Sequence, residues 1–179
     1  MAQFPPAPNL TKALADLTLV DSDGAPVALS SLWAKQGCLI RHVRSFSSLG
    51  CRAAVQELLG AQRRFAEYQV KLAVILPEEL AKAKAWRSEV RVTFPVLTDP
   101  EKLSFQAVGA KEINWGTPEN IKGMSKTSLS TSVRLNRSLR FNPATHLFEA
   151  GGRPLFCWLN TNLKDDCTLN QLFDALDDL

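Results

Sequence analysis

The stretch from Cys38 to Leu59 constrains the fold most, because it sets a strand, a turn and a helix in immediate succession. Its first part, Cys38 to Val43, is a mostly apolar run that is typical of a buried strand. A Ser- and Gly-rich turn spans residues 45–50. The helix that follows carries apolar residues on one face, at Cys51, Val55, Leu58 and Leu59. This order predicts a strand that runs directly into a helix packed on its sheet.

A second apolar run, Val70 to Leu76, is continuous over seven residues. Such runs are typical of parallel strands that are covered on both faces. Pro77 and the acids after it predict the start of another helix, with Leu80, Ala83, Trp86 and Val90 as its inner stripe. Strands that alternate with helices predict an α/β fold with a mostly parallel sheet.

The rest of the chain supplies shorter elements. Turn signals at Asp21–Gly24 and Gly151–Gly152 predict one hairpin near each end of the chain. The other predicted elements are strands at 17–20, 26–29, 94–97, 145–150 and 154–159, and helical segments at 30–33, 101–108 and 169–179.

The sequence predicts a single domain over residues 1–179, since no boundary or repeat is visible. Residues 1–13 contain three prolines and read as an extended arm. Residues 111–142 are basic, rich in Ser, Thr and Asn, and show little periodicity. This loop-rich insertion is either a surface loop or a lid or partner surface beside the site.

Composition excludes some function classes. The chain has 179 residues and a net charge of +3, which is too small to predict nucleic-acid binding. No apolar run approaches the roughly 20 residues that a membrane-spanning helix needs. The N-terminus has neither a basic start nor an apolar core, so no secretory signal is expected. We therefore expect a cytoplasmic protein, in which stable disulfides are rare.

Cys51 is the candidate nucleophile. Ser48 is a good N-cap, which places Cys51 in the first helical turn, where unpaired N–H groups and the helix dipole favour an anion. Arg44 and Arg52 add positive charge, and the thiolate is the reactive form of cysteine. The alternative is that Cys51 is a small apolar residue under the start of the helix.

The other cysteines and the histidines have simpler interpretations. No two of the four cysteines form a C-x-x-C pair, and no Cys/His cluster has zinc spacing, so no metal site is expected. Cys38 and Cys157 are interpreted as core residues, and His42 as a core histidine with its hydrogen bonds satisfied. Cys167 lies in a polar turn and is the best candidate for a second reactive thiol.

Taken together, these segments resemble the alkyl hydroperoxide reductase/thiol-specific antioxidant family, the peroxiredoxin-like branch of the thioredoxin fold. Residues 17–32, LTLVDSDGAPVALSSL, are similar to the family's opening hairpin, and 94–100, FPVLTDP, to its F-P-x-L-x-D-P motif. Residues 48–52, SLGCR, match the family's T/S-x-x-C. Pro143–Thr145 with Gly151–Gly152 is similar to the entry into its late hairpin. The resemblance implies a three-layer α/β/α sandwich with a mixed central sheet and an N-terminal β-hairpin.

The resemblance also implies roles for residues. Cys51 would be the peroxidatic nucleophile that attacks a peroxide and becomes a sulfenic acid. Ser48 would hydrogen-bond the thiolate or the peroxide. Arg140 is the nearest match to the family's charge-stabilising arginine, with Arg137 or Arg134 as substitutes. Cys167 would be the resolving thiol, unless Cys157, another molecule or a small thiol does this.

The implied partners are hydrogen peroxide or an organic hydroperoxide and a thiol reductant, either a thioredoxin-like protein or a small thiol. No cofactor is implied, and a homodimer is allowed. The sequence departs from the family at Arg44, which stands in the place of a proline, and at Ser48, which replaces the first cysteine of the C-x-x-C of some relatives. Two alternatives therefore remain: a redox-inactive thioredoxin-fold binding protein and a monothiol disulfide reductase. Pro143 is a candidate for a cis-proline beside the site.

Overall fold

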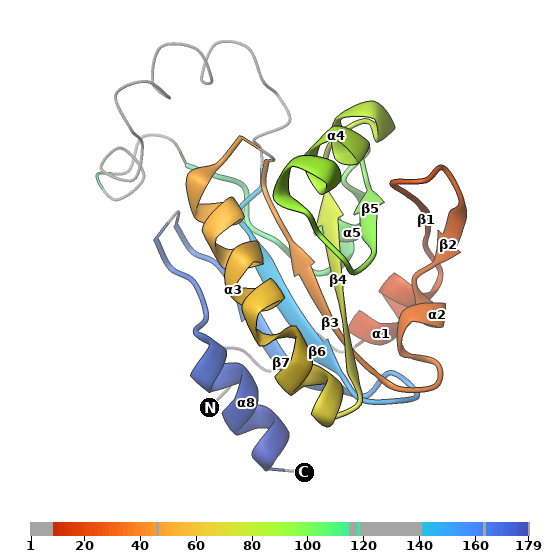
Figure 1. Cartoon of the computed structure of the whole chain (residues 1–179), viewed down its shortest axis with the longest axis vertical. Coiled ribbons are helices and arrows are strands. Elements are labelled where there is room, and N and C mark those ends of the chain that lie inside the picture. The colour runs from red at the N-terminus through yellow and green to blue at the C-terminus, as the bar shows by residue number, and fades with distance from the viewer. Residues whose placement is uncertain (1–8, 46, 115–117, 119–140, 163, 179) are drawn as a thin grey trace.

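The computed structural model describes residues 9–45, 47–114, 118, 141–162 and 164–178. Its described part contains one seven-stranded mixed sheet with the order β2-β1-β5-β4-β3-β6-β7 (Figure 1). The strands are β1 (Thr18–Asp21), β2 (Pro26–Ala28), β3 (Gly37–His42), β4 (Val70–Leu76), β5 (Val96–Thr98), β6 (Ala144–Phe148) and β7 (Pro154–Leu159).

Helices cover both faces of the sheet. One face packs against α3 (Leu49–Glu67), α4 (Leu80–Val90) and α8 (Leu169–Asp177), which lie in front of the strands in Figure 1. The opposite face packs against α1 (Leu10–Ala15), α2 (Ser30–Trp33) and α5 (Leu103–Ala107). The predicted three-layer α/β/α architecture, with its mixed sheet and N-terminal hairpin of β1 and β2, is confirmed.

The two apolar runs form the centre of the sheet. β3 pairs in parallel with β4, and β4 pairs in parallel with β5. β6 pairs antiparallel with β3 and also with β7. All six residues of β3 are buried, because helices cover both of its faces. The prediction of parallel strands covered on both sides is therefore confirmed for β3 and β4.

The N-terminal segment differs from the prediction. Residues 1–13 were expected to be extended, but Leu10–Ala15 form helix α1. Leu10 and Leu14 are four residues apart and share one face of α1. Both are buried in the core between the sheet and α5. Thr11 Oγ1 donates to the carbonyl of Gly152 at 2.7 Å, which ties α1 to the late hairpin. Residues 1–8 lie outside the described part.

The last elements lead from the late hairpin to α8. Gly151 and Gly152 both have positive φ, as the tight turn between β6 and β7 requires. Thr168 and Gln171 form a capping box at the start of α8, so the chain direction there is fixed. Most of the predicted insertion 111–142 lies outside the described residues, and its role, like the single-domain organisation of 1–179, stays a prediction.

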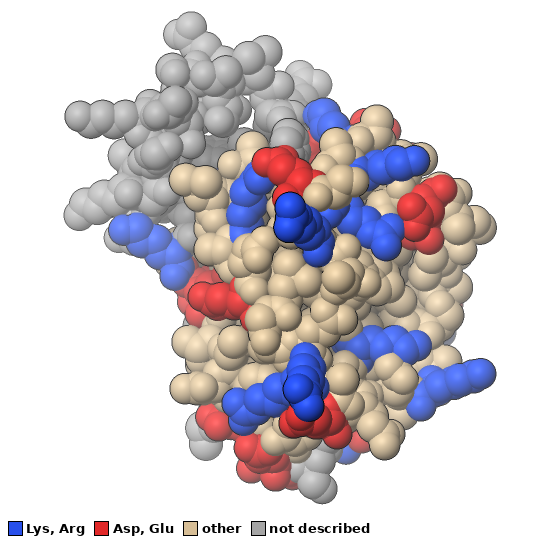
Figure 2. Space-filling model, in the orientation of Figure 1, with Lys and Arg blue, Asp and Glu red and all other residues tan. Residues whose placement is uncertain are grey.

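The outer face of α3, α4 and α8 carries charges of both signs. Figure 2 shows Lys and Arg interspersed with Asp and Glu on this face, around an area without charged groups. The longest described helix, α3, has 19 residues. Within the described ranges, no helix combines the length and apolar character that crossing a membrane would need.

Candidate active site

Cys51 lies in the first turn of α3, as the sequence predicts. Ser48 is the N-cap, and its Oγ accepts a hydrogen bond from the backbone N–H of Cys51 at 3.4 Å. A hydroxyl both accepts and donates, so Ser48 Oγ can also donate to a thiolate or a peroxide beside it. Cys51 is 3% exposed and Ser48 is 8% exposed. Cys51 is thus held under the surface in the first turn of α3, at the positive end of the helix dipole.

A buried arginine reaches the same site from the sheet. Arg41 lies on β3 between Leu39 and Val43, which belong to the core on the α3 side. Its partner across the antiparallel ladder is Thr145 of β6, and Arg41 Nη1 donates to Thr145 Oγ1 at 2.5 Å. Side chains two residues apart on a strand share one face. The guanidinium therefore points to the layer that contains α3 and α8.

Arg41 is neutralised by an acid from the loop before α8. Nη1 donates to Asp166 Oδ1 at 2.5 Å, and Nη2 donates to Asp166 Oδ2. The Arg41 side chain is 3% exposed and the Asp166 side chain is 34% exposed. A buried charge needs a partner of opposite sign, and a two-point contact between guanidinium and carboxylate is the strongest form of this pair.

The guanidinium also connects the two candidate thiols. Arg41 Nη1 lies 4.0 Å from Cys167 Sγ. Burial by itself would lower the pKa of Arg41, but Asp166, Cys167 and Cys51 raise that pKa above its usual value. Of these three groups, Cys51 has the smallest effect on Arg41, and it interacts with the guanidinium electrostatically.

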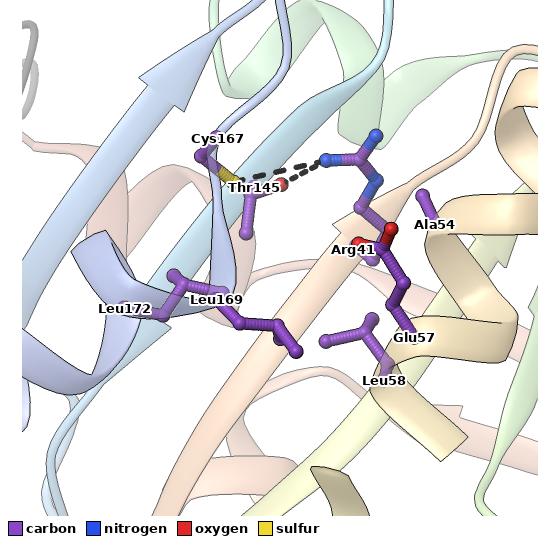
Figure 3. Close-up of a pocket in the computed structure, with 8 residues that line it drawn as sticks. All are labelled: Arg41, Ala54, Glu57, Leu58, Thr145, Cys167, Leu169 and Leu172. Carbon is purple, nitrogen blue, oxygen red and sulfur yellow. Dashed lines mark hydrogen bonds between the residues drawn. The ribbon is translucent and has the colours of Figure 1, made fainter. Parts of the chain in front are cut away.

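Arg41, Thr145 and Cys167 line a small cavity between β3, β6, α3 and the start of α8 (Figure 3). Its free volume is about 20 Å³, room for roughly one water molecule. A wider, open depression of about 600 Å³ adjoins it and shares Cys167 and Ala54. Cys167 is half-buried and lines both spaces, so this residue is more exposed than Cys51.

Of Arg52 and Arg140, which the sequence predicts to add positive charge at the site, only Arg52 lies in the described part of the chain. Arg140, like Arg134 and Arg137, lies outside the described residues, so its predicted role is untested. Arg52 turns to α4, where it makes a two-point contact with Glu89, with the shorter distance 2.7 Å. Its charge is therefore balanced by Glu89, and it adds less positive potential at Cys51 than the sequence suggested.

The remaining cysteines fit the core interpretation. Burial raises the pKa of Cys38 to about 12, partly offset by Lys71, and burial raises the pKa of Cys157 to about 11. Neither is a thiolate at neutral pH. Among the described residues, no group of three or more His, Cys, Asp or Glu side chains is placed to bind a metal ion.

His42 and Pro143 depart from their interpretations. His42 is buried as expected, but neither of its ring nitrogens has a hydrogen-bond partner among the described residues. The peptide bond before Pro143 is trans, and the described residues contain no cis peptide bond, so the prediction of a cis-proline is wrong. Pro143 still leads into β6, and its carbonyl accepts from Asn160 N at 3.1 Å.

Sequence reasoning missed Arg41, Thr145 and Asp166. A signal for Arg41 was present, because an arginine inside a strand that is expected to be buried on both faces must find a partner there. Nothing local marks Asp166 as that partner, since it is 125 residues away in the sequence. Their meeting depends on how α8 returns to the sheet.

This fold and site define a thioredoxin-fold protein with a single cysteine at a helix N-terminus beside a buried arginine. The chain belongs to the AhpC/TSA family, whose family model matches residues 10–125. The predicted family is thus confirmed. A search of curated protein sequences gave no match.

Solved structures share the fold over almost the whole chain. Peroxiredoxin Q from Xanthomonas campestris is 16% identical with a TM-score of 0.71, covering 99% of this chain and 97% of that chain. The bacterioferritin comigratory protein of the same organism, described for its alkyl peroxide reduction activity, is 15% identical (TM-score 0.71; 99% and 98% covered). Peroxidoxin BcpB from Mycobacterium tuberculosis is 16% identical (TM-score 0.66; 92% and 91% covered). At these identities the likeness shows the fold.

Proposed function

We propose that the chain is a thiol peroxidase that reduces hydrogen peroxide or organic hydroperoxides through Cys51. Membership of the AhpC/TSA family supports this activity. The single observation that carries it is local: Cys51 follows the N-cap Ser48 in the first turn of α3, within electrostatic reach of the buried Arg41 guanidinium. A peroxide reaction needs a thiolate, and a helix N-terminus and a nearby cation are the surroundings in which reactive cysteines are found.

The first step joins sulfur to oxygen. The Cys51 thiolate attacks one oxygen of the peroxide, an S–O bond forms and the O–O bond breaks, and the leaving oxygen takes the electron pair and then a proton. Cys51 becomes a sulfenic acid, and the leaving oxygen is released as water from hydrogen peroxide or as an alcohol from an organic hydroperoxide. The oxygen on Cys51 is released as water later, when a thiol resolves the sulfenic acid. Arg41 stabilises the negative charge that moves onto the leaving oxygen, and the Ser48 hydroxyl orients the peroxide.

Cys167 is proposed as the resolving thiol. It attacks the sulfenic sulfur of Cys51, an S–S bond forms, and water leaves. Its contact with Arg41 supports this role, because the same guanidinium interacts with Cys51. Cys167, the more exposed of the two residues, then meets an external thiol reductant, either a small thiol or a thioredoxin-like protein, which restores both thiols.

The test is mass spectrometry after one equivalent of hydrogen peroxide, combined with peroxide consumption in the presence of a thiol. Cys51 should be oxidised first, to a sulfenic acid or to a disulfide with Cys167. Cys51→Ser should abolish consumption, while Cys157→Ala, which removes a buried thiol of high pKa, should leave it unchanged. Unchanged consumption by Cys51→Ser would refute the proposal.

The arginines are compared in the same assay. Arg41→Gln should lower the rate of Cys51 oxidation by about 100-fold, the usual effect of removing a donor that stabilises developing charge. Arg140→Gln tests, by the same rate of Cys51 oxidation, the arginine to which the family resemblance assigns this role. If Arg140→Gln has the large effect and Arg41→Gln has none, the charge-stabilising role belongs to Arg140.

The alternatives are outcomes of the same experiments. A protein that reduces glutathione mixed disulfides but not peroxides would be a monothiol disulfide reductase. A Cys51 thiol with a pKa at or above the ordinary value of about 8.5 and no reaction with peroxide would indicate a binding protein. A cytoplasmic location and a homodimer remain proposals, which fractionation and light scattering would test.

A further inference from the structure

Three groups share one buried cation. The Arg41 guanidinium contacts the Thr145 hydroxyl, the Asp166 carboxylate and, at 4.0 Å, the Cys167 sulfur. Asp166 and Cys167 are adjacent in the sequence, so one short stretch of chain brings both an acid and a thiol to the same guanidinium. Nothing in the reaction proposed above needs the acid.

We propose that Asp166 is a positioning residue that anchors Cys167 beside Arg41. It keeps Cys167 from reacting with peroxide, so that Cys51 is oxidised first and Cys167 reacts only in the second step. This inference rests on the proposed function. It assigns Asp166 two effects that can be measured separately: it fixes the place of the Cys167 loop, and its negative charge opposes ionisation of the Cys167 thiol.

The anchoring effect follows from the contacts of the loop. On one side, Asn162 Oδ1 accepts from Lys164 N and Asp165 N, and Asp165 Oδ2 accepts from Thr161 N and Oγ1. On the other side, Thr168 begins the capping box of α8. These contacts are local to the loop or to the start of its helix. The two-point contact of Asp166 with Arg41 attaches this stretch to the sheet through an ion pair, beside the weaker contacts of the Cys167 sulfur with Arg41 and Thr145.

The charge effect follows from the groups that surround Cys167. Burial raises the pKa of the Cys167 thiol, Arg41 and Thr145 lower it, and Asp166 raises it. From α3, Glu57 faces the same cavity, whereas α8 contributes only the apolar side chains of Leu169 and Leu172 there. Cys51 interacts electrostatically with the shared Arg41 guanidinium. Asp166 thus offsets part of the decrease in the Cys167 pKa that Arg41 causes.

This arrangement separates the roles of two thiols that share one cation. If both were thiolates, either could consume peroxide, and a sulfenic acid on the more accessible Cys167 would form at the wrong position. With Cys167 held as a thiol, peroxide oxidises Cys51. The Cys167 sulfur then attacks the Cys51 sulfenic sulfur, the S–S bond replaces the S–O bond, and the hydroxyl leaves with the thiol proton as water.

The charge effect is measured without peroxide. In a Cys51→Ser background, the rate of Cys167 alkylation by iodoacetamide is followed by peptide mass spectrometry from pH 6 to pH 10. Asp166→Asn should move the midpoint of this profile to lower pH and raise the rate at pH 7 about threefold or more, because loss of the carboxylate favours the thiolate. Asp166→Glu should restore most of the wild-type profile.

A matched control is available in the late hairpin. Glu149 makes a two-point contact with Arg153, and Glu149→Gln removes that carboxylate far from the site. It should leave the Cys167 profile unchanged. If Asp166→Asn raises the plateau rate but leaves the midpoint where it was, the loop has only been released and the charge effect is refuted.

Asp166→Asn leaves a buried guanidinium without its carboxylate and can fail to fold. A second comparison uses the single variant Arg41→Gln and the double variant Arg41→Gln/Asp166→Asn. Neither of them contains an unpaired buried cation. The midpoint for the double variant should lie below that for Arg41→Gln alone. Equal midpoints contradict the charge effect.

The anchoring effect is measured in protein with all cysteines present. After one equivalent of peroxide, Asp166→Asn should form the Cys51–Cys167 disulfide at least several-fold more slowly and accumulate Cys51 sulfinic acid with further peroxide. Unchanged disulfide formation refutes anchoring. These outcomes are distinct from failure of the proposed function, in which Cys51 would not be oxidised at all while the alkylation experiment would still report on Asp166.

Discussion

Acidification should destabilise this protein through two buried histidines. His42 and His146 are the only histidines in the chain, and both are 0% exposed. Their rings meet edge to face with centroids 5.8 Å apart, on the sheet face that carries α1, α2 and α5. None of their four ring nitrogens has a hydrogen-bond partner among the described residues. Burial without hydrogen-bond partners therefore stabilises the neutral imidazole form of both histidines relative to the charged imidazolium form.

The size of the effect follows from the shifted equilibria. Burial lowers the pKa of His146 to about 3, and burial, His146 and Arg41 hold the pKa of His42 well below its usual value. The unfolded chain titrates near pH 6.5, so below this pH the unfolded state binds protons that the folded state does not. Stability is complete above pH 6.5 and falls as the pH drops toward 3. Between pH 7 and pH 5 the loss is about 2 kcal/mol for each histidine, or about 4 kcal/mol in total.

Denaturant unfolding, followed by circular dichroism at pH 7, 6 and 5, measures this loss directly. His146→Phe replaces an ionisable ring by an apolar one and should halve the dependence on pH, and adding His42→Phe should nearly abolish it. Carboxylates change little in this range, because their ordinary pKa values are near 4. A free energy of unfolding that is flat from pH 7 to pH 5, or an equal slope in wild type and double variant, would refute the reasoning.

Two further predictions concern the helices that position the site. Phe65→Ala on α3 should cost about 3–5 kcal/mol of unfolding free energy, since Phe65 is fully buried and stacked on Phe173 of α8 with centroids 4.6 Å apart; thermal melting that is unchanged would contradict the packing. Thr168→Ala should cost about 1 kcal/mol by removing the N-cap of α8, with Thr168→Asn, another good cap, as the control that retains stability.

The part of the site that could be predicted is the part that is local in sequence. Ser48 and Cys51 are three residues apart, and strand, N-cap and helix signals place them without knowledge of the rest of the fold. The hairpin and helix after residue 143 were also predicted, because turn residues and helical spacing mark them. By contrast, helix α1 was missed, since the prolines before it outweighed the spacing of Leu10 and Leu14.

What could not be predicted depends on contacts between distant segments. Arg41 and Asp166 form one ion pair, yet the residues around each of them do not indicate the partner. Five acidic residues lie in the last 15 residues alone, and each was a possible partner for Arg41. The histidine pair is similar: His42 and His146 lie on strands that become neighbours only in the folded sheet. Spacing along the chain gives the face on which a side chain lies, but it does not give the partner across the sheet.

Arg41 is a second candidate for the charge that the family resemblance assigns to an arginine elsewhere in the chain. The family resemblance placed the stabilising arginine on the segment that leads into β6, where Arg140 is the nearest match. The structure places a guanidinium on β3, directly across the ladder from Thr145 of β6. Neighbouring strands lie about 4.8 Å apart, and an arginine side chain is longer than that distance. An arginine on either strand is therefore long enough to reach the space above Thr145, and the comparison of Arg41→Gln with Arg140→Gln decides which guanidinium acts on Cys51.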